Sequence, residues 1–197
     1  MKNKINYFLS IIFFLLVNSN ISYSSELTFK ALTVETFEEG NIIRGVGEAE
    51  AKTLDGLEIF ADKFEYNKNK GLLIASGKVR VLDKENQIIL KSENIHYTEI
   101  DNKIISYDDT YIDIENKYFI KTKNLNYEHL IKELFSKSPT LITDNFNNKI
   151  ESQEFKYFFN EEIVRAKKIF LHDNENNKYL LEDGLIKLEE NLLLGKD

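Results

Sequence analysis

Apolar and polar residues alternate in short runs along most of the chain, and this alternation repeats about every thirty residues. One column of the repeat has members 30 or 31 residues apart: Tyr66, Tyr97, Tyr127, Tyr157 and Leu188. A second column lies two positions earlier: Phe64, Ile95, Leu125, Phe155 and Ile186. A third lies seven positions before the first: Ile59, Leu90, Ile120, Ile150 and Leu181. A fixed period of this kind indicates stacked units that bury their apolar faces against one another.

Each repeat has the pattern of two β-strands. Ile, Val, Phe and Tyr recur at period two in runs bounded by polar residues and Gly. Clusters rich in Asn and Asp, which favour turns, recur between the runs, at 67–71, 83–86, 144–148 and 173–177. The sequence therefore predicts a meander of roughly ten to twelve antiparallel strands.

The spacing of the columns also predicts that the strands bend. Ile59 and Phe64 are five residues apart, as are Leu90 and Ile95, whereas residues on one face of a flat strand differ by an even number. The second strand of the repeat shows the same step from Ile74 to Val79. A bulge or bend in mid-strand would return both halves to one interior. We therefore expect an all-β, antiparallel open β-jellyroll built from two-strand repeats, with the small residues Ala61, Ser92, Thr122 and Ser152 where it is tight.

Twenty apolar residues are expected to line the interior of this jellyroll. They are Ile59, Phe64, Tyr66, Ile74, Val79, Val81, Leu90, Ile95, Tyr97, Ile105, Ile112, Ile120, Leu125, Tyr127, Leu141, Ile150, Phe155, Tyr157, Ile169 and Leu171. Periodicity alone leaves two alternatives open, a packed core and an apolar trough that also contacts lipid.

The first residues have the pattern of a secretory signal peptide. Lys2 and Lys4 precede the apolar run 7–17, and small residues at 22 and 24 suit a cleavage site. This run is much shorter than the roughly 20 residues that span a bilayer as a helix. We therefore expect a signal peptide at 1–24, a jellyroll domain at 25–197, and release into the periplasm.

Composition and charge narrow the classes of function. The chain has 197 residues, no Cys and a net charge of −7, which argues against thiol chemistry and against binding of nucleic acid. His96, His129 and His172 form no known catalytic or metal motif, and His172, Asp173 and Glu175 lie in what reads as an ordinary turn. We expect no catalytic residues, no metal and no cofactor, and therefore no enzyme.

Three segments resemble the OstA-like family of lipopolysaccharide-transport proteins: 61–66 (ADKFEY), 73–79 (LIASGKV) and 92–97 (SENIHY). Within that family the pattern is similar to the N-terminal periplasmic domain of the outer-membrane assembly proteins (the LptD group), and the soluble bridge proteins (the LptA group) are the alternative. The LptD resemblance implies an outer-membrane β-barrel beyond Asp197, so we expect a longer protein.

The resemblance implies a jellyroll that shields the acyl chains of lipid A and joins related jellyrolls end to end in a periplasmic bridge associated with the outer membrane. A different class of function stays open, namely a structural β-solenoid with a dry core and no lipid cargo. A continuous apolar cleft would favour the first, and a filled interior the second.

The N-terminal strand is the expected docking edge for a related jellyroll. An edge strand carries unpaired main-chain groups, and this one lacks the Pro residues that often protect such edges. The edge is expected to comprise Leu27, Thr28, Phe29, Ala31, Leu32, Thr33 and Val34.

Overall fold

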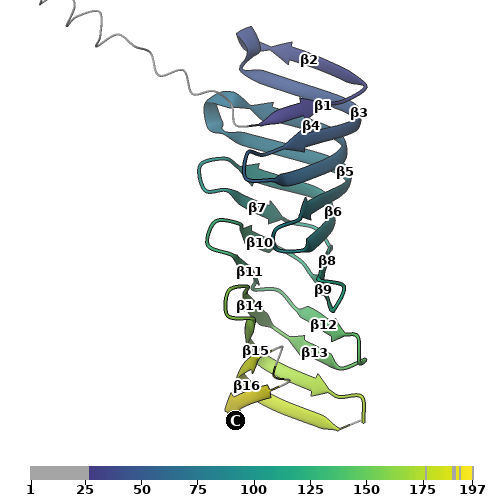
Figure 1. Cartoon of the computed structure of the whole chain (residues 1–197), viewed down its shortest axis with the longest axis vertical. Coiled ribbons are helices and arrows are strands. Elements are labelled where there is room, and N and C mark those ends of the chain that lie inside the picture. Colours follow the sequence, from purple (N-terminus) through teal and green to yellow (C-terminus); the bar gives the residue numbers. More distant parts are fainter. Residues whose placement is uncertain (1–26, 176, 188–189, 191, 197) are drawn as a thin grey trace, which may run out of the picture.

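Antiparallel strands are stacked along the length of the molecule (Figure 1), with the N-terminal strands at one end and the C-terminal strands at the other. The structure is a computed structural model that describes residues 27–175, 177–187, 190 and 192–196. Within these residues 17 strands belong to one hydrogen-bonded sheet, which confirms the all-β, jellyroll-like architecture. The strands outnumber the ten to twelve that were expected, because from Lys103 to Phe158 the chain forms separate short strands on the two sides of the bend. The expected signal peptide and the column residue Leu188 lie outside the described residues.

The strands differ in length along the stack. Two short strands come first, β1 (Thr28–Lys30) and β2 (Thr33–Phe37), followed by the single turn η1 (Glu38–Gly40). Long strands follow: β3 (Ile42–Lys52), β4 (Leu57–Asn67), β5 (Leu72–Asp83) and β6 (Ile88–Thr98), with the turn η2 (Lys68–Lys70) between β4 and β5. Short strands then come in pairs: β7 (Lys103–Ser106), β8 (Thr110–Ile114), β9 (Tyr118–Thr122), β10 (Leu125–Glu128), β11 (Glu133–Ser136), β12 (Thr140–Asp144), β13 (Lys149–Ser152) and β14 (Glu154–Phe158). The described part ends with β15 (Ile163–His172), β16 (Lys178–Lys187) and β17 (Leu192–Lys196).

The pairings divide the stack into two half-sheets that share one core. Strand β6 shows the division, because residues 95–98 pair with β7 whereas 88–91 pair with β8. Half-sheet A contains β2, β7, β10, β11, β14 and β17, and half-sheet B contains β1, β8, β9, β12 and β13. The long strands β3 to β6, with β15 and β16, cross the bend and contribute to both, although β16 meets β17 only in half-sheet A. The turns at the strand ends that lie away from the bend form one edge of each half-sheet, and we call this edge the free margin of that half-sheet.

The bends that were expected from the column spacing are present. The register shifts between Val46 and Ala49 in β3, between Phe60 and Lys63 in β4, and between Ser76 and Val79 in β5. Gly77 has φ of 81° there, and a Cβ at this position would lie 2.5 Å from Asp62 Oδ2. Because a left-handed backbone without a side chain is needed, glycine is the residue that fits this bend.

Three residues that were expected to line the interior lie on the outward face instead. Ile74, Ile105 and Leu141 are half-buried on the outward face, whereas their neighbours Leu73, Ile104 and Ile142 point inward. In β5 the inward residues on either side of the bend are Ala75 and Val79, which are four positions apart. The column spacing had placed Ile74 and Val79, five positions apart, on the inner face.

The expected N-terminal strand over 27–34 is also corrected. The chain forms two strands there, β1 on half-sheet B and β2 on half-sheet A, with Ala31 and Leu32 between them. The Leu32 backbone N–H donates to the Gly47 carbonyl at 2.9 Å, which anchors the break against the bend in β3.

Side chains fill the interior through the N-terminal and middle parts of the stack. Leu73, Leu90, Ile95, Leu125 and Leu134 are fully buried and belong to one continuous core. Phe29 on β1 covers the N-terminal end, with its ring centroid 4.8 Å from that of Phe64. Of the two alternatives left open by the sequence, the packed core therefore applies to most of the described part, and an apolar trough does not run through it.

Candidate functional site

The interior opens at the C-terminal end of the stack. A cavity of about 450 Å³ lies there between the half-sheets. Its apolar lining comes from β12, β13, β15, β16 and β17: Ile142, Ile150, Ile169, Leu171, Leu181, Ile186, Leu192 and Leu193. Leu125 in the middle of the stack is fully buried, whereas Ile150 is 9% exposed and Leu171, Leu181 and Leu193 are half-buried. The same inward face therefore changes from a packed core to an accessible surface along the stack.

The pairing of the last strands explains the opening. Strand β17 pairs with residues 183–187 of β16, and residues 178–181 of β16 pair with β15 alone among the described strands. Among the described strands, half-sheet A therefore has one strand more than half-sheet B at this end of the stack. Glycines keep the backbone close to the lining, since a Cβ on Gly184 would lie 2.3 Å from Ile169 Cδ1 and one on Gly195 would lie 2.4 Å from Leu181 Cδ1.

Polar groups from the turns of half-sheet B form the rim of this cavity. Asp144, Asn148 and Asp173 line it together with Tyr179 and Lys187. Asp144 and Asp173 each accept backbone N–H bonds within their own turns. The Asn177 side-chain amide, with the backbone N–H groups of the turn, lowers the pKa of the Asp173 carboxyl below its ordinary value. An apolar floor with a charged rim suits a ligand that has an apolar chain and a polar head.

Most residues that the sequence placed in the interior are buried there, but few reach the cavity. Sixteen of the twenty are core residues: Ile59, Phe64, Tyr66, Val79, Val81, Leu90, Ile95, Tyr97, Ile112, Ile120, Leu125, Tyr127, Ile150, Phe155, Tyr157 and Ile169. Of the twenty, Ile150, Ile169 and Leu171 line the cavity. The sequence interpretation missed Ile142, Leu181, Ile186, Leu192 and Leu193. Leu181 and Ile186 belong to the repeat columns, so this signal was available for those two.

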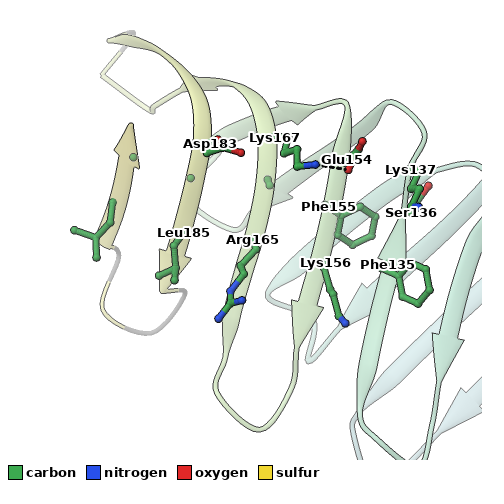
Figure 2. Close-up of a pocket in the computed structure, with 14 residues that line it drawn as sticks. Phe135, Ser136, Lys137, Glu154, Phe155, Lys156, Arg165, Lys167, Asp183 and Leu185 are labelled. Atoms are coloured by element: carbon green, nitrogen blue, oxygen red, sulfur yellow. Dashed lines mark ion pairs between the residues drawn. The ribbon is translucent and has the colours of Figure 1, made fainter. Parts of the chain in front are cut away.

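A second hollow, of about 590 Å³, lies over half-sheet A near the bend (Figure 2). Lys156 and Arg165 lie on the neighbouring strands β14 and β15, and Lys167 forms an ion pair with Glu154 at 3.2 Å. Lys156 is also paired, with Glu133 at 2.6 Å. Lys156 and Lys167 are thus compensated by carboxylates, whereas the Arg165 guanidinium lies over the Phe158 ring, 5.0 Å from its centroid.

The described residues include no cluster of three or more His, Cys, Asp or Glu side chains that could hold a metal ion. In the same part of the chain, no helix is long and apolar enough to cross a membrane.

Comparisons with known proteins identify no family for this chain. No family model matches the chain, and no curated protein matches it. Among solved structures it is similar to LptH, the LptA homologous periplasmic component of the conserved lipopolysaccharide transport device from Pseudomonas aeruginosa. That similarity has 11% sequence identity and a TM-score of 0.29, and it covers 73% of this chain and 86% of LptH. A likeness at this level supports no functional conclusion.

Proposed function

We propose that this protein is a periplasmic jellyroll of the lipopolysaccharide-transport type, which binds acyl chains of lipid A at its C-terminal opening. The cavity of about 450 Å³ with an apolar floor and a polar rim carries the proposal. Burial of an acyl chain there gains about 0.8 kcal/mol per methylene. Because such contacts are not directional, a chain bound in this way is able to slide along the lining. The proposed role is binding and transfer of lipid, without catalysis and without a cofactor.

The finer parts of the proposal rest on the sequence. The signal-peptide pattern supports the periplasm, and the OstA-like segments support docking onto related jellyrolls and association with the outer membrane. Assignment to the LptD group rather than the LptA group rests on the same segments.

A structural β-solenoid with a dry core is the second candidate function. The filled interior supports it, because fully buried side chains such as Leu90 and Leu134 leave no path along the middle of the stack. In that case function would lie on the outer faces, and the cavity at the C-terminal end would carry no lipid.

Two neighbouring residues on β16 allow a matched test. Leu181 lines the cavity, whereas Leu180 points outward and is 76% exposed. A benzophenone amino acid is placed at either position in cells that make lipopolysaccharide, and the crosslinked protein is probed for lipopolysaccharide after irradiation. We expect adducts at position 181 and none at position 180. Equal labelling at both, or no labelling at either, would contradict the proposal and favour the dry core.

A further inference from the structure

The free margins of the two half-sheets meet at a buried polar cluster. Half-sheet A contributes Tyr127 at the end of β10 and His129 in the turn that follows. Half-sheet B contributes Asp83 at the end of β5 and Asp55 in the turn between β3 and β4. His129 and Asp83 are only 6% and 3% exposed. We call the line along which these margins touch the seam.

The imidazole of His129 lies between the two carboxylates. Its Nδ1 is 3.0 Å from Asp83 Oδ2, and its Nε2 is 3.3 Å from Asp55 Oδ2. The Tyr127 hydroxyl donates to the same oxygen of Asp83. On the solvent side, the Lys132 ammonium lies 2.8 Å from Glu85 Oε1 and spans the seam a second time.

The geometry matches a protonated imidazole. His129 Nδ1 donates to Asp83 Oδ2, whereas Nε2 lies within ion-pair distance of Asp55 Oδ2 but outside hydrogen-bond geometry. The positive charge of the doubly protonated ring therefore lies between two carboxylates, and the neutral ring lacks this attraction. Burial alone would raise the pKa of Asp83, but hydrogen bonds from His129, Asn86 and Tyr127 hold it well below its ordinary value. The hydrogen bond with Asp83 raises the pKa of His129 above its ordinary value, against the effect of burial. Asp55 and Glu85 add to this attraction from half-sheet B.

Side chains, rather than strand pairing, hold the seam together at this point. Strand β10 pairs with β7 and β11, and β5 pairs with β4 and β6. The backbone of the nearby turn also bonds within its own half-sheet, since the His129 backbone N–H donates to the Asn102 carbonyl of half-sheet A at 3.2 Å. Separation of the margins would therefore break side-chain contacts and leave every strand ladder intact.

We propose that Asp55, Asp83, Tyr127 and His129 form a latch that holds the seam shut, and that its release opens the filled middle of the jellyroll to an acyl chain. The identity of the cargo rests on the proposed function, whereas the latch itself does not. The latch accounts for a closed interior in the middle of a stack that has a cavity between its last described strands. Two half-sheets joined at a bend and held at their margins have two discrete arrangements, closed and parted.

The first experiment measures the seam without any lipid. The chain has no cysteine, so Glu85→Cys with Lys132→Cys places one spin label on each margin. The control pair, Arg44→Cys with Glu65→Cys, spans two adjacent strands of half-sheet A at a surface ion pair and does not cross the seam. We expect His129→Gln or Asp83→Asn to lengthen and broaden the distance distribution at the seam and to leave the control pair unchanged. Raising the pH in the protein with its latch intact should do the same.

An unchanged seam distance in His129→Gln and across the pH series would overturn the latch. The pH series decides the question even if Asp83→Asn fails to fold, because it uses the unsubstituted latch.

The second experiment links the seam to cargo with 11-(dansylamino)undecanoic acid as the acyl-chain probe. A disulfide or a short crosslinker between the cysteines at 85 and 132 locks the seam, and cleavage of that link releases it. We expect at least a threefold gain in probe binding on release, and a further gain in the His129→Gln background. Equal binding in the locked and released states would overturn the gating role. If no variant bound the probe, including the unlocked wild-type chain, the proposed function would fail, while the spin-label distances would still decide whether the latch exists.

Discussion

The tyrosines of the repeat combine an apolar ring in the core with a hydroxyl group that forms hydrogen bonds, which leucine lacks. Their rings are buried in the core, and their hydroxyls reach the polar margin. Tyr66 donates to Glu99 at 2.6 Å, and Tyr97 donates to Asn102 at 3.0 Å, both within half-sheet A. Tyr127 instead donates across the seam to half-sheet B. At these three levels of the stack, a buried ring with a polar tip thus connects the core to the turns.

His129 predicts a specific pH dependence of stability. Its pKa is raised in the folded state by Asp83, so the stabilisation from its charged form is present at low pH and is lost as the pH rises through that raised value. Asp83, whose pKa is lowered, keeps its charge throughout this window. We expect the melting temperature of the wild-type chain to fall as the pH rises above about 6.5, the ordinary pKa of histidine, and this fall to be smaller in His129→Gln. Differential scanning calorimetry across that range measures both.

His96→Gln is the control for this comparison, because His96 is a half-buried ring on β6 that packs edge-on against Tyr107, away from the seam. We expect His96→Gln to keep the fall in melting temperature that the seam histidine causes. A profile for His129→Gln that matched the wild type would show that the seam histidine does not titrate in this window.

At the scale of the strands, the sequence predicted the inward residues that recur with the thirty-residue period. The repeat columns identified the inward residues of β4, β6, β9 and β10, because one interior imposes one period on every copy. The phase of β5 and of β7 could not be predicted in the same way. Apolar residues occupy both faces there, as in Leu72-Leu73-Ile74 and Ile104-Ile105, so alternation does not distinguish the inner face from the outer one.

The contacts of the proposed latch and the position of the C-terminal cavity could not be predicted from the repeat pattern. His129 and Asp83 are 46 residues apart, and the position of His129 is occupied by Glu99 and Phe159 in the neighbouring copies. The contact depends on how the two half-sheets are placed relative to each other, which no local pattern encodes. The cavity likewise depends on where pairing stops in half-sheet B.

The bend in β5 predicts a cost for Gly77→Ala. A methyl group there would meet Asp62 and would force a side chain into a left-handed backbone. We expect a loss of about 1–3 kcal/mol in the free energy of unfolding, measured by urea denaturation. Gly56→Ala separates the two causes, because Gly56 also has a positive φ, of 96°, but no atom lies within 4 Å of its added Cβ. Equal losses at both positions would mean that backbone conformation, rather than the contact with Asp62, sets the cost.

At the scale of the whole molecule, the two ends of the stack differ. Phe29 covers the core at the N-terminal end of the described stack, where its ring centroid lies 5.1 Å from that of Tyr66, whereas a cavity lies between the last described strands. Strands β1 and β2 pair with β3 on one side only among the described strands. Leu32 and Val34 are exposed beside this edge. The N-terminal end therefore offers a strand edge over a closed core, and the other end offers an opening.

This edge predicts where a related jellyroll docks. Adjacent residues of an edge strand direct their N–H groups to opposite sides, one toward β3 and one outward, so Thr33→Pro and Val34→Pro together test both. We expect the substitution that removes the outward N–H to abolish association with a purified related jellyroll while the melting temperature stays near that of the wild type. The other should lower the melting temperature, because it removes a bond to β3. Thr33→Ala and Val34→Ala keep the N–H groups and should bind normally. Analytical ultracentrifugation of the mixtures measures association, and unchanged binding by both proline variants would mean that the partner contacts a face of the jellyroll instead of this edge.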